Sequence, residues 1–376
     1  MIPLFKVAMA SDVADFILPV LHSGYIGEGS KSQELEKAVG NFIGNENVIL
    51  VNSGTSAITI ALKLAGVEHG DKVVSTPMTC LATSMSILSV GAVPVWADIL
   101  PDGTMNPIDV WRKVDQSGAK AIVCMDWGGL PCRLSELSFI AGHFGISLIE
   151  DACQALGAEY NGKKIGNQSE MCCFSFQAIK QLTTVDGGLL AITTNSPFYT
   201  KSLLEEGKTR RWFGLDRSKG ADMRCNQDPP FAGYKWQSND VLASIGLANI
   251  RGLQDRLEVT RAHARAYNDA FGIKTDPARE SSYWLYTIFV KDVDKFIQYM
   301  KENGVECSRV HDRNDTKTVF KDSRANLPGV DWFDKYHVCI PVGWWLEDCQ
   351  VEMISDLIIK YKENNYERQS FQGAVE

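Results

Sequence analysis

Short apolar segments alternate with longer amphipathic segments between residues 48 and 192, and this alternation constrains the fold more than any other feature. Apolar strands separated by amphipathic helices indicate a mostly parallel sheet that is covered on both faces. The sequence therefore predicts an α/β fold. The expected strands are residues 48–51, 72–76, 93–98, 119–126, 146–151 and 188–192, and the expected helices include 33–43, 55–64 and 134–144.

Polar residues follow several of these expected strands, at 52–56, 76–77, 126–129 and 150–151. In open α/β sheets, ligands bind beyond the carboxyl ends of the strands. We therefore expect a functional site at this edge of the sheet.

The segment Asn52-Ser-Gly-Thr-Ser56 joins an expected strand to the start of an expected helix. Backbone N–H groups, hydroxyls and the positive helix end together make a site suited to a phosphate. Serine and threonine also cap helices without any ligand, so this segment alone favours neither interpretation.

Asp151 ends an apolar segment, and Gln154 follows three residues later. A carboxylate at a strand end could pair with a protonated ring nitrogen, and the amide could donate to a ring oxygen. The alternative interpretation is that Asp151 caps the helix that follows.

Lys180 ends the apolar run Met171-Cys-Cys-Phe-Ser-Phe-Gln-Ala-Ile-Lys180, which also contains Ser175. An amine at the mouth of a buried strand is a candidate Schiff-base nucleophile, because desolvation lowers its pKa. Taken alone, it is more simply one of 38 lysines and arginines, lying in solvent.

Composition excludes several classes of protein. The 376 residues are 45% hydrophobic and 22% charged, as in globular proteins, and the net charge of −8 argues against a nucleic-acid or membrane-surface partner. Neither an apolar stretch long enough to span a membrane nor a signal peptide is expected. Ten cysteines are scattered without metal-ligand spacing. They indicate reduced thiols, no metal site and a cytoplasmic location.

The alternation weakens after residue 192. An extended arm precedes residue 33, helical periodicity dominates from about 240 to 271, and residues 283–290 resemble a strand. We expect a large α/β domain at 1–250 and a smaller α+β domain at 251–376.

A phosphate-type turn, a strand-end aspartate and a strand-end lysine, in this order, are the parts that pyridoxal phosphate (PLP) needs. The pattern resembles the fold type I aminotransferases, and more closely the DegT/DnrJ/EryC1/StrS family of sugar aminotransferases. The resemblance implies a mostly parallel seven-stranded sheet. It is carried along nearly the whole chain by Ser53-Gly-Thr-Ser-Ala57, Glu150-Asp-Ala-Cys-Gln-Ala-Leu-Gly157 and Phe174-Ser-Phe-Gln-Ala-Ile-Lys180, and more weakly by Ile2-Pro-Leu-Phe-Lys6, residues 22–29, Gly233-Tyr-Lys235 and Ile340-Pro-Val-Gly-Trp344.

The resemblance also implies roles for individual residues. Lys180 would bind PLP as a Schiff base and shuttle a proton, and Asp151 would keep the pyridine nitrogen protonated. Gln154 would bind the phenolic oxygen. Three further residues would hold the phosphate: Thr55, Ser56 and Ser175.

Two positions depart from the family pattern. Lys235 stands where the family often has asparagine, at a position that reaches the phosphate of the neighbouring subunit in a homodimer. Cys80 stands where an aromatic residue commonly stacks on the cofactor ring, and Trp127 is our candidate to replace that stacking.

The implied reaction carries an amino group from an amino acid, L-glutamate, to a keto or aldehydo sugar for polysaccharide or lipopolysaccharide biosynthesis. A nucleotide-linked sugar or a free octulosonic sugar acid would each call for cations, and the candidates are Arg211, Arg309, His311 and Arg313. A PLP-dependent sugar dehydratase is a rival, but members of that type carry histidine in place of Lys180. A dinucleotide-binding oxidoreductase is disfavoured because no G-x-G-x-x-G follows the first strand.

Overall fold

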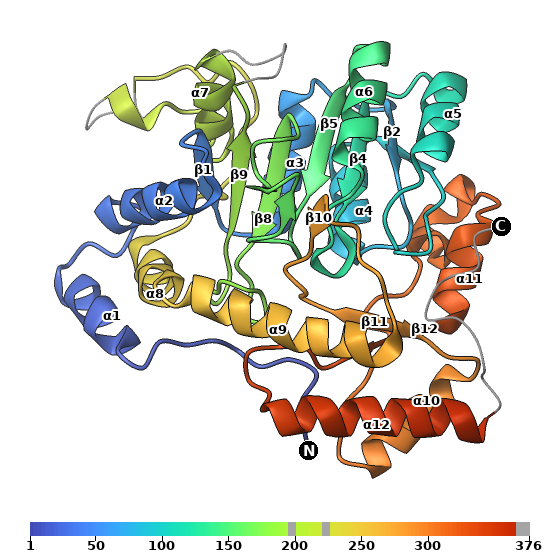
Figure 1. The fold of residues 1–376 in the computed structure, drawn as a ribbon. Helices are drawn as coiled ribbons and strands as arrows, with labels where there is room; N and C mark the ends of the chain where they lie inside the picture. The colour runs from blue at the N-terminus through green and yellow to red at the C-terminus, as the bar shows by residue number, and fades with distance from the viewer. Residues whose placement is uncertain (195–200, 220–225, 366–376) are drawn as a thin grey trace.

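The computed structural model describes residues 1–194, 201–219 and 226–365. A seven-stranded sheet with the order β1-β9-β8-β5-β4-β2-β3 forms its centre (Figure 1). Strand β9 runs antiparallel to both of its neighbours, and the other pairs are parallel. The predicted mostly parallel α/β sheet is therefore confirmed. Its strands are β1 Val48–Val51, β2 Lys72–Ser75, β3 Val93–Trp96, β4 Ala121–Met125, β5 Ser147–Asp151, β8 Met171–Ser175 and β9 Gly188–Ile192.

Alternate residues of each strand enter two separate hydrophobic clusters, one on each face of the sheet. In β5, Leu148 packs in one cluster and Ile149 in the other. Both faces are covered, which explains why the strands are continuously apolar. The helices of this part are α2 Ser30–Ile43, α3 Gly54–Leu64, α4 Leu81–Ser89, α5 Pro107–Ser117, α6 Leu134–Phe144, α7 Lys201–Arg210 and α8 Asp240–Ile250.

Two helices differ from the sequence prediction. The arm before residue 33 is not extended throughout, because residues 13–22 form α1 (Val13–His22) despite Pro19 within it. Helix α5 was not predicted, although its signals are local: Asn106 caps its start, Pro107 is the first helical residue and Gly118 follows its end with positive φ.

The helical periodicity from 240 to 271 is two helices, α8 and α9 (Leu253–Phe271), separated at Arg251 and Gly252. A third hydrophobic cluster joins α9 to the C-terminal elements. The division into domains at residue 250 stays a prediction. The remaining elements are α10 Val293–Glu302, α11 Pro328–Tyr336, α12 Asp348–Asn364, β6 Glu159–Tyr160, β7 Lys163–Lys164, β10 Arg279–Glu280, β11 Tyr286–Phe289 and β12 His337–Ile340.

The N-terminal arm, residues 1–6, precedes α1 and lies beside α12, among the C-terminal elements (Figure 1). Ile2 forms a parallel bridge with Val305, and the indole N–H of Trp345 donates to the carbonyl of Pro3 at 3.2 Å. The arm is thereby attached to the part of the chain that is farthest from it in sequence.

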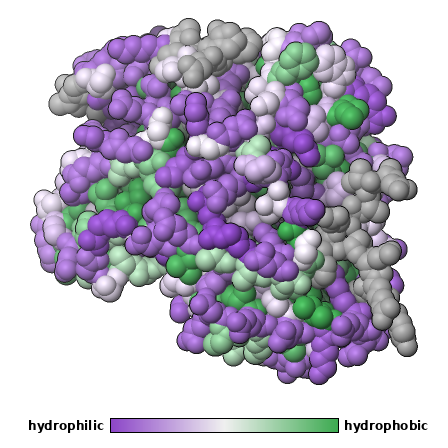
Figure 2. All heavy atoms as spheres, in the orientation of Figure 1, coloured by the Kyte–Doolittle hydropathy of each residue, from purple (hydrophilic) through white to green (hydrophobic). Residues whose placement is uncertain are grey.

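Polar residues cover most of the face shown in Figure 2, and apolar side chains lie there in separate patches. Among the described residues, no helix is long and apolar enough to cross a membrane.

Candidate active site

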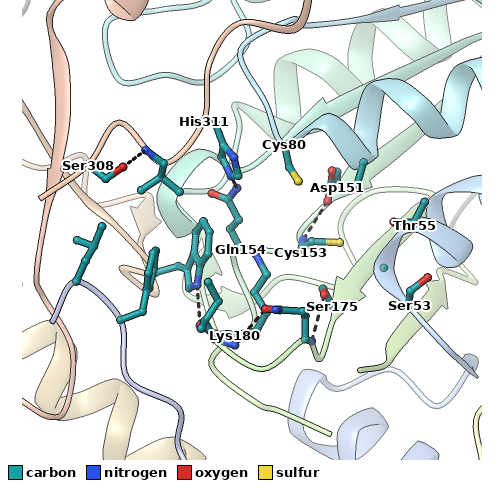
Figure 3. Close-up of a pocket in the computed structure, with 18 of the residues that line it drawn as sticks. Ser53, Thr55, Cys80, Asp151, Cys153, Gln154, Ser175, Lys180, Ser308 and His311 are labelled. Carbon is teal, nitrogen blue, oxygen red and sulfur yellow. Dashed lines mark hydrogen bonds between the residues drawn. The ribbon is translucent and has the colours of Figure 1, made fainter. Parts of the chain in front are cut away.

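A cavity of about 930 Å³ lies where β5 and β8 end and α3 begins (Figure 3). The predicted edge of the sheet therefore carries a cavity. Seven of the predicted residues line it: Thr55, Cys80, Asp151, Gln154, Ser175, Lys180 and His311.

The start of α3 forms one end of this cavity. Ser53 caps the helix, because its Oγ accepts the backbone N–H of Ser56 at 3.1 Å, and Thr55 and Ser175 lie beside it in the lining. Ser56 itself is buried outside the lining, and its hydroxyl donates to Oδ1 of Asn52 at 2.6 Å. A phosphate here would meet the helix end and the hydroxyls of Thr55 and Ser175.

Gly54 allows the start of α3 to lie close to Cys153 and to the end of β8. A Cβ atom at this position would lie 2.6 Å from Sγ of Cys153 and 3.0 Å from Cβ of Ser175. Any other residue would push the helix start away from β8 and widen the space between them.

Asp151 is the last residue of β5 and is almost fully buried. Its Oδ2 accepts the hydroxyl of Thr83 at 2.6 Å, and its Oδ1 accepts the backbone N–H of Cys153 at 3.1 Å. None of the described helices begins at Asp151, so it does not cap a following helix.

Gln154 has a fixed amide orientation. Its Oε1 accepts the backbone N–H of Gly128 at 2.9 Å, so its Nε2 faces His311, whose Nε2 lies 3.0 Å away. Burial, with the nearby Lys180 charge, lowers the pKa of His311 to about 4. A neutral His311 accepts this hydrogen bond and carries its proton on Nδ1, and the second amide hydrogen of Gln154 remains for a ligand.

Lys180 lies in a turn, five residues beyond the end of β8 at Ser175, and not at the strand end that the sequence predicted. Its backbone N–H donates to the carbonyl of Gln177 at 2.9 Å, which closes the turn. Burial lowers the pKa of its amine despite nearby thiol and carboxylate groups that act in the opposite direction. Desolvation is the effect that a Schiff-base lysine requires.

Trp284 is a cavity residue in contact with this amine that the sequence did not predict. Nζ of Lys180 lies 3.6 Å from the centroid of the Trp284 ring, and the indole N–H donates to the carbonyl of Ile179 at 2.9 Å. Ile179 and Trp284 are 105 positions apart in the chain, so no local pattern could have paired them.

Trp127, the candidate for ring stacking, does not line the cavity. It is buried in a hydrophobic cluster, and its indole N–H donates to Oγ1 of Thr287 at 3.0 Å. Its ring packs against His311, which lines the cavity, with ring centroids 5.9 Å apart. Cys80 lines the cavity and directly precedes α4.

The three predicted arginines lie outside the cavity lining, because each is held by acceptors within the chain. Arg211 is buried and pairs with Glu28 at 2.5 Å and with Glu36 at 3.0 Å. Arg313 pairs with Asp315 at 2.8 Å and with Asp331. Arg309 donates to the carbonyl of Asp334.

Lys235 also lies outside this lining, and its Nζ is 3.8 Å from the centroid of the Trp212 ring. The cation that the lining does contain, besides Lys180, is Lys301 of α10. No pattern in the sequence distinguished Lys301 from other exposed lysines.

The residues present fit PLP. The cavity offers an anion site at the start of α3, a buried carboxylate, an amide donor and a desolvated amine, and Gly54 keeps the anion site narrow. Within the described chain, no group of three or more histidine, cysteine, aspartate or glutamate residues is placed to hold a metal ion.

A mostly parallel sheet that brings these groups to the ends of its strands defines a fold type I enzyme of the PLP-dependent class. The chain belongs to the DegT/DnrJ/EryC1/StrS aminotransferase family, whose model matches residues 8–358. The predicted family and enzyme class are confirmed, and the cavity residues fit the predicted cofactor: this is a PLP-dependent sugar aminotransferase.

Known proteins similar to this chain agree with the family. AtS13 from Actinomadura melliaura is 35% identical, with a TM-score of 0.89 over 96% of this chain and 98% of its own. The sugar aminotransferase CalS13 from Micromonospora echinospora is 32% identical, with a TM-score of 0.90 over 96% of this chain and 100% of its own. The spore coat polysaccharide biosynthesis protein SpsC from Bacillus subtilis is 30% identical over 81% of this chain and 76% of its own.

Proposed function

We propose that this enzyme moves an amino group from L-glutamate to the carbonyl of a nucleotide-linked keto or aldehydo deoxy sugar. The product would enter cell-surface polysaccharide or lipopolysaccharide biosynthesis in the cytoplasm. The observation that carries the proposal is the meeting of Lys180, Asp151 and the start of α3 at one cavity. The described function of SpsC in polysaccharide biosynthesis supports the pathway class.

When bound, PLP supplies an electron sink that carries the amino group between two substrates. Lys180 takes up and returns protons at Nζ, because its lowered pKa makes the neutral amine available. Asp151 would hold a proton on the ring nitrogen. Gln154 would donate to the phenolic oxygen, and Thr55 and Ser175 would hold the phosphate.

Apolar side chains form part of the wall of the cavity. Leu4 and Phe5 of the N-terminal arm lie there, together with Trp284 and Val310. Such a wall excludes water from the reacting groups and suits a sugar that lacks some of its hydroxyls.

We also propose a homodimer in which Lys235 of one subunit reaches the phosphate site of the other. Two observations support this: Lys235 lies outside the cavity of its own subunit, and that cavity contains few cations of its own. Analytical ultracentrifugation tests the dimer. A Lys235→Ala enzyme that binds PLP as tightly as the wild type would refute the role of Lys235.

A free octulosonic sugar acid is the second candidate substrate. His311 and Lys301 line the cavity and could bind either a carboxylate or a diphosphate, whereas the three arginines are occupied within the subunit. The cavity therefore supports both substrates.

The test loads the enzyme with PLP and L-glutamate, and then adds keto sugars one at a time. Loss of the absorbance of the lysine-bound cofactor with glutamate, and its return with a nucleotide-linked keto sugar, is the expected result. Return with an oxidised octulosonate alone would replace the first substrate by the second. No change with any of several amino acids would favour a dehydratase.

Lys180→Ala and Lys301→Ala make a matched pair for this assay, because both remove a lysine that lines the same cavity. Lys180→Ala should lower the glutamate half-reaction by roughly 10²–10⁴-fold, the range of a lost proton-transfer group, and should keep the wild-type fold. Lys301→Ala should keep the rate of that half-reaction at saturating glutamate, because Lys301 is expected to bind substrate and not to transfer the proton. Normal turnover by Lys180→Ala would refute the assignment.

A further inference from the structure

Thr83 is a buried hydrogen-bond donor to the carboxylate of Asp151. It lies in the first turn of α4, is fully buried, and donates its hydroxyl to Oδ2 of Asp151 at 2.6 Å. The backbone N–H of Cys153 occupies Oδ1. Both oxygens thus have a donor, and the carboxylate cannot rotate without breaking at least one short bond in a buried site.

A second threonine sets the direction of this hydrogen bond. Oγ1 of Thr79 lies 2.8 Å from Oγ1 of Thr83, and Thr79 is also fully buried. Because Thr83 has a single hydroxyl proton and gives it to Asp151, Thr79 must be the donor in this pair. Donors in series polarise one another, which strengthens the bond to the carboxylate.

The turn that carries Thr79 is anchored from the C-terminal part of the chain. Nδ2 of the buried Asn314 donates to the carbonyl of Thr79 at 3.1 Å and lies 2.9 Å from Oγ of Ser84. The carbonyl of Thr79 lies four residues before Thr83, but Thr79 precedes the N-cap Cys80 of α4, and its carbonyl is occupied by Asn314.

Buried hydroxyls farther along α4 and in α3 donate to the carbonyl four residues back, which is the ordinary pattern within a helix. Ser86 donates to the carbonyl of Ala82 at 2.9 Å, and Thr59 donates to the carbonyl of Thr55 at 2.8 Å. Thr83 instead donates to a side chain on a different element. Satisfying a buried hydroxyl does not require this arrangement.

We propose that Thr83, supported by Thr79, is a positioning residue that orients Asp151 toward the ring nitrogen of the cofactor. This inference rests on the proposed role of Asp151. Thr83 does not line the cavity, so it acts through Asp151 and does not touch the cofactor. Thr83 and Cys153 each donate to one oxygen of the Asp151 carboxylate. The lone pairs that remain on these oxygens are available to the ring nitrogen of the cofactor.

The test compares Thr83→Val, which has nearly the same shape without the hydroxyl, with Thr83→Ser, which keeps the hydroxyl. We measure the affinity of each apoenzyme for PLP and the pH dependence of the bound-cofactor absorbance. Thr83→Val should bind PLP about tenfold more weakly and shift the pH dependence, as expected for a lost hydrogen bond to a charged group. Thr83→Ser should stay within about twofold of the wild type.

Thr104→Val is the matched control. Thr104 is also fully buried, and its hydroxyl donates to Oδ1 of Asp102 at 2.6 Å, but neither residue lines the cavity. It should resemble the wild type in cofactor affinity and spectrum. Equal effects of Thr104→Val and Thr83→Val on melting temperature, with no effect of either on the cofactor, would mean that Thr83 is only structural.

Asp151→Asn, alone and combined with Thr83→Val, separates this inference from the proposed function. If Thr83 acts through Asp151, Thr83→Val should change cofactor affinity by less than about twofold in the Asp151→Asn background. A folded Thr83→Val protein with wild-type affinity and spectrum would overturn the inference, provided that Asp151→Asn is impaired. An unimpaired Asp151→Asn would instead refute the role proposed for Asp151.

Thr79→Val provides the same test if Thr83→Val does not fold. It removes the outer hydroxyl only, and should weaken cofactor binding about two- to threefold in the same direction, as a neutral hydrogen bond would. Wild-type affinity in a folded Thr79→Val protein, together with wild-type affinity in Thr83→Ala, would also overturn the inference.

Discussion

The amine of Lys180 lies over the face of Trp284, with Nζ 3.6 Å from the ring centroid. Two effects of the ring oppose each other. A ring face attracts an ammonium group, worth about 0.5–2 kcal/mol, whereas the bulk of the indole keeps water away from the amine. Burial is the largest cause of the lowered pKa of Lys180, so we expect water exclusion to dominate.

Trp284→Ala should therefore raise the pKa of Lys180 by about one unit, because it admits water to the amine. The rate at which PLP recombines with the apoenzyme reports this pKa, since only the neutral amine attacks the aldehyde. The pH profile of that rate should move to higher pH in Trp284→Ala and stay near the wild type in Trp284→Phe. A move to lower pH would show that the ring mainly stabilises the ammonium form.

His311 makes the folded state sensitive to acid. Its pKa is lowered to about 4 by burial, compared with about 6.5 in an unfolded chain. A base with a depressed pKa contributes stability that is present above about pH 6.5 and is lost as the pH falls toward 4. The free energy of unfolding should thus fall by about 2 kcal/mol between pH 7 and 5 because of this residue.

His311→Gln should remove that part of the pH dependence, because glutamine does not titrate. Urea unfolding at pH 7 and pH 5, for the variant and the wild type, measures the difference. An identical loss in both proteins would mean that the pKa of His311 is the same in the folded and the unfolded state, which would refute the lowered value.

Local patterns in the sequence were sufficient for the sheet and for much of the candidate site. Asp151 and Lys180 follow strands, and a parallel sheet brings its strand ends to one edge, so their common cavity could be predicted. The distance of Lys180 from its strand could not, because the apolar residues Phe176 and Ile179 continue the strand pattern into the turn.

Contacts between distant segments account for what the sequence did not predict. Arg211 looked available for a substrate, but the Glu28 that neutralises it comes from the loop before α2. Trp284 and Phe5 reach the cavity from segments far apart in the sequence, and their sequence neighbours do not indicate it.

Two buried carboxyl groups outside the cavity lining should also make the free energy of unfolding depend on pH. Asp126 and Glu150 are fully buried neighbours, and Oδ2 of Asp126 and Oε1 of Glu150 have no donor among the described residues unless one of the two carboxyl groups is protonated. Burial first, and then the neighbouring Glu150, hold the pKa of Asp126 well above its usual range. An acid with a raised pKa contributes stability that is complete below about pH 4 and is lost as the pH rises toward the folded-state value.

Asp126→Asn should therefore be increasingly stabilising, relative to the wild type, as the pH rises from 5. Its amide can donate to Glu150 as the protonated carboxyl does, and its oxygen can still accept the backbone N–H of Cys132. The gain should grow by about 1.4 kcal/mol per pH unit until the wild-type pKa is reached. Chemical denaturation at pH 5, 6 and 7 checks this, and a constant difference would show that Asp126 is ionised in the folded state.

The N-terminal arm predicts a change in substrate binding that leaves the cofactor untouched. Phe5 stacks on Trp284 with ring centroids 5.1 Å apart, and the backbone N–H of Leu4 donates to Oε2 of Glu306 at 3.3 Å. Phe5→Ala should raise KM for the sugar about two- to tenfold, the worth of an aromatic contact, without altering the glutamate half-reaction. Val7→Ala, an exposed position on the same segment outside the cavity lining, should change neither. Steady-state kinetics with the sugar, together with single-turnover kinetics with glutamate, make the distinction. Equal losses of rate in both half-reactions would mean that Phe5 acts on Lys180 through Trp284 and does not bind the sugar.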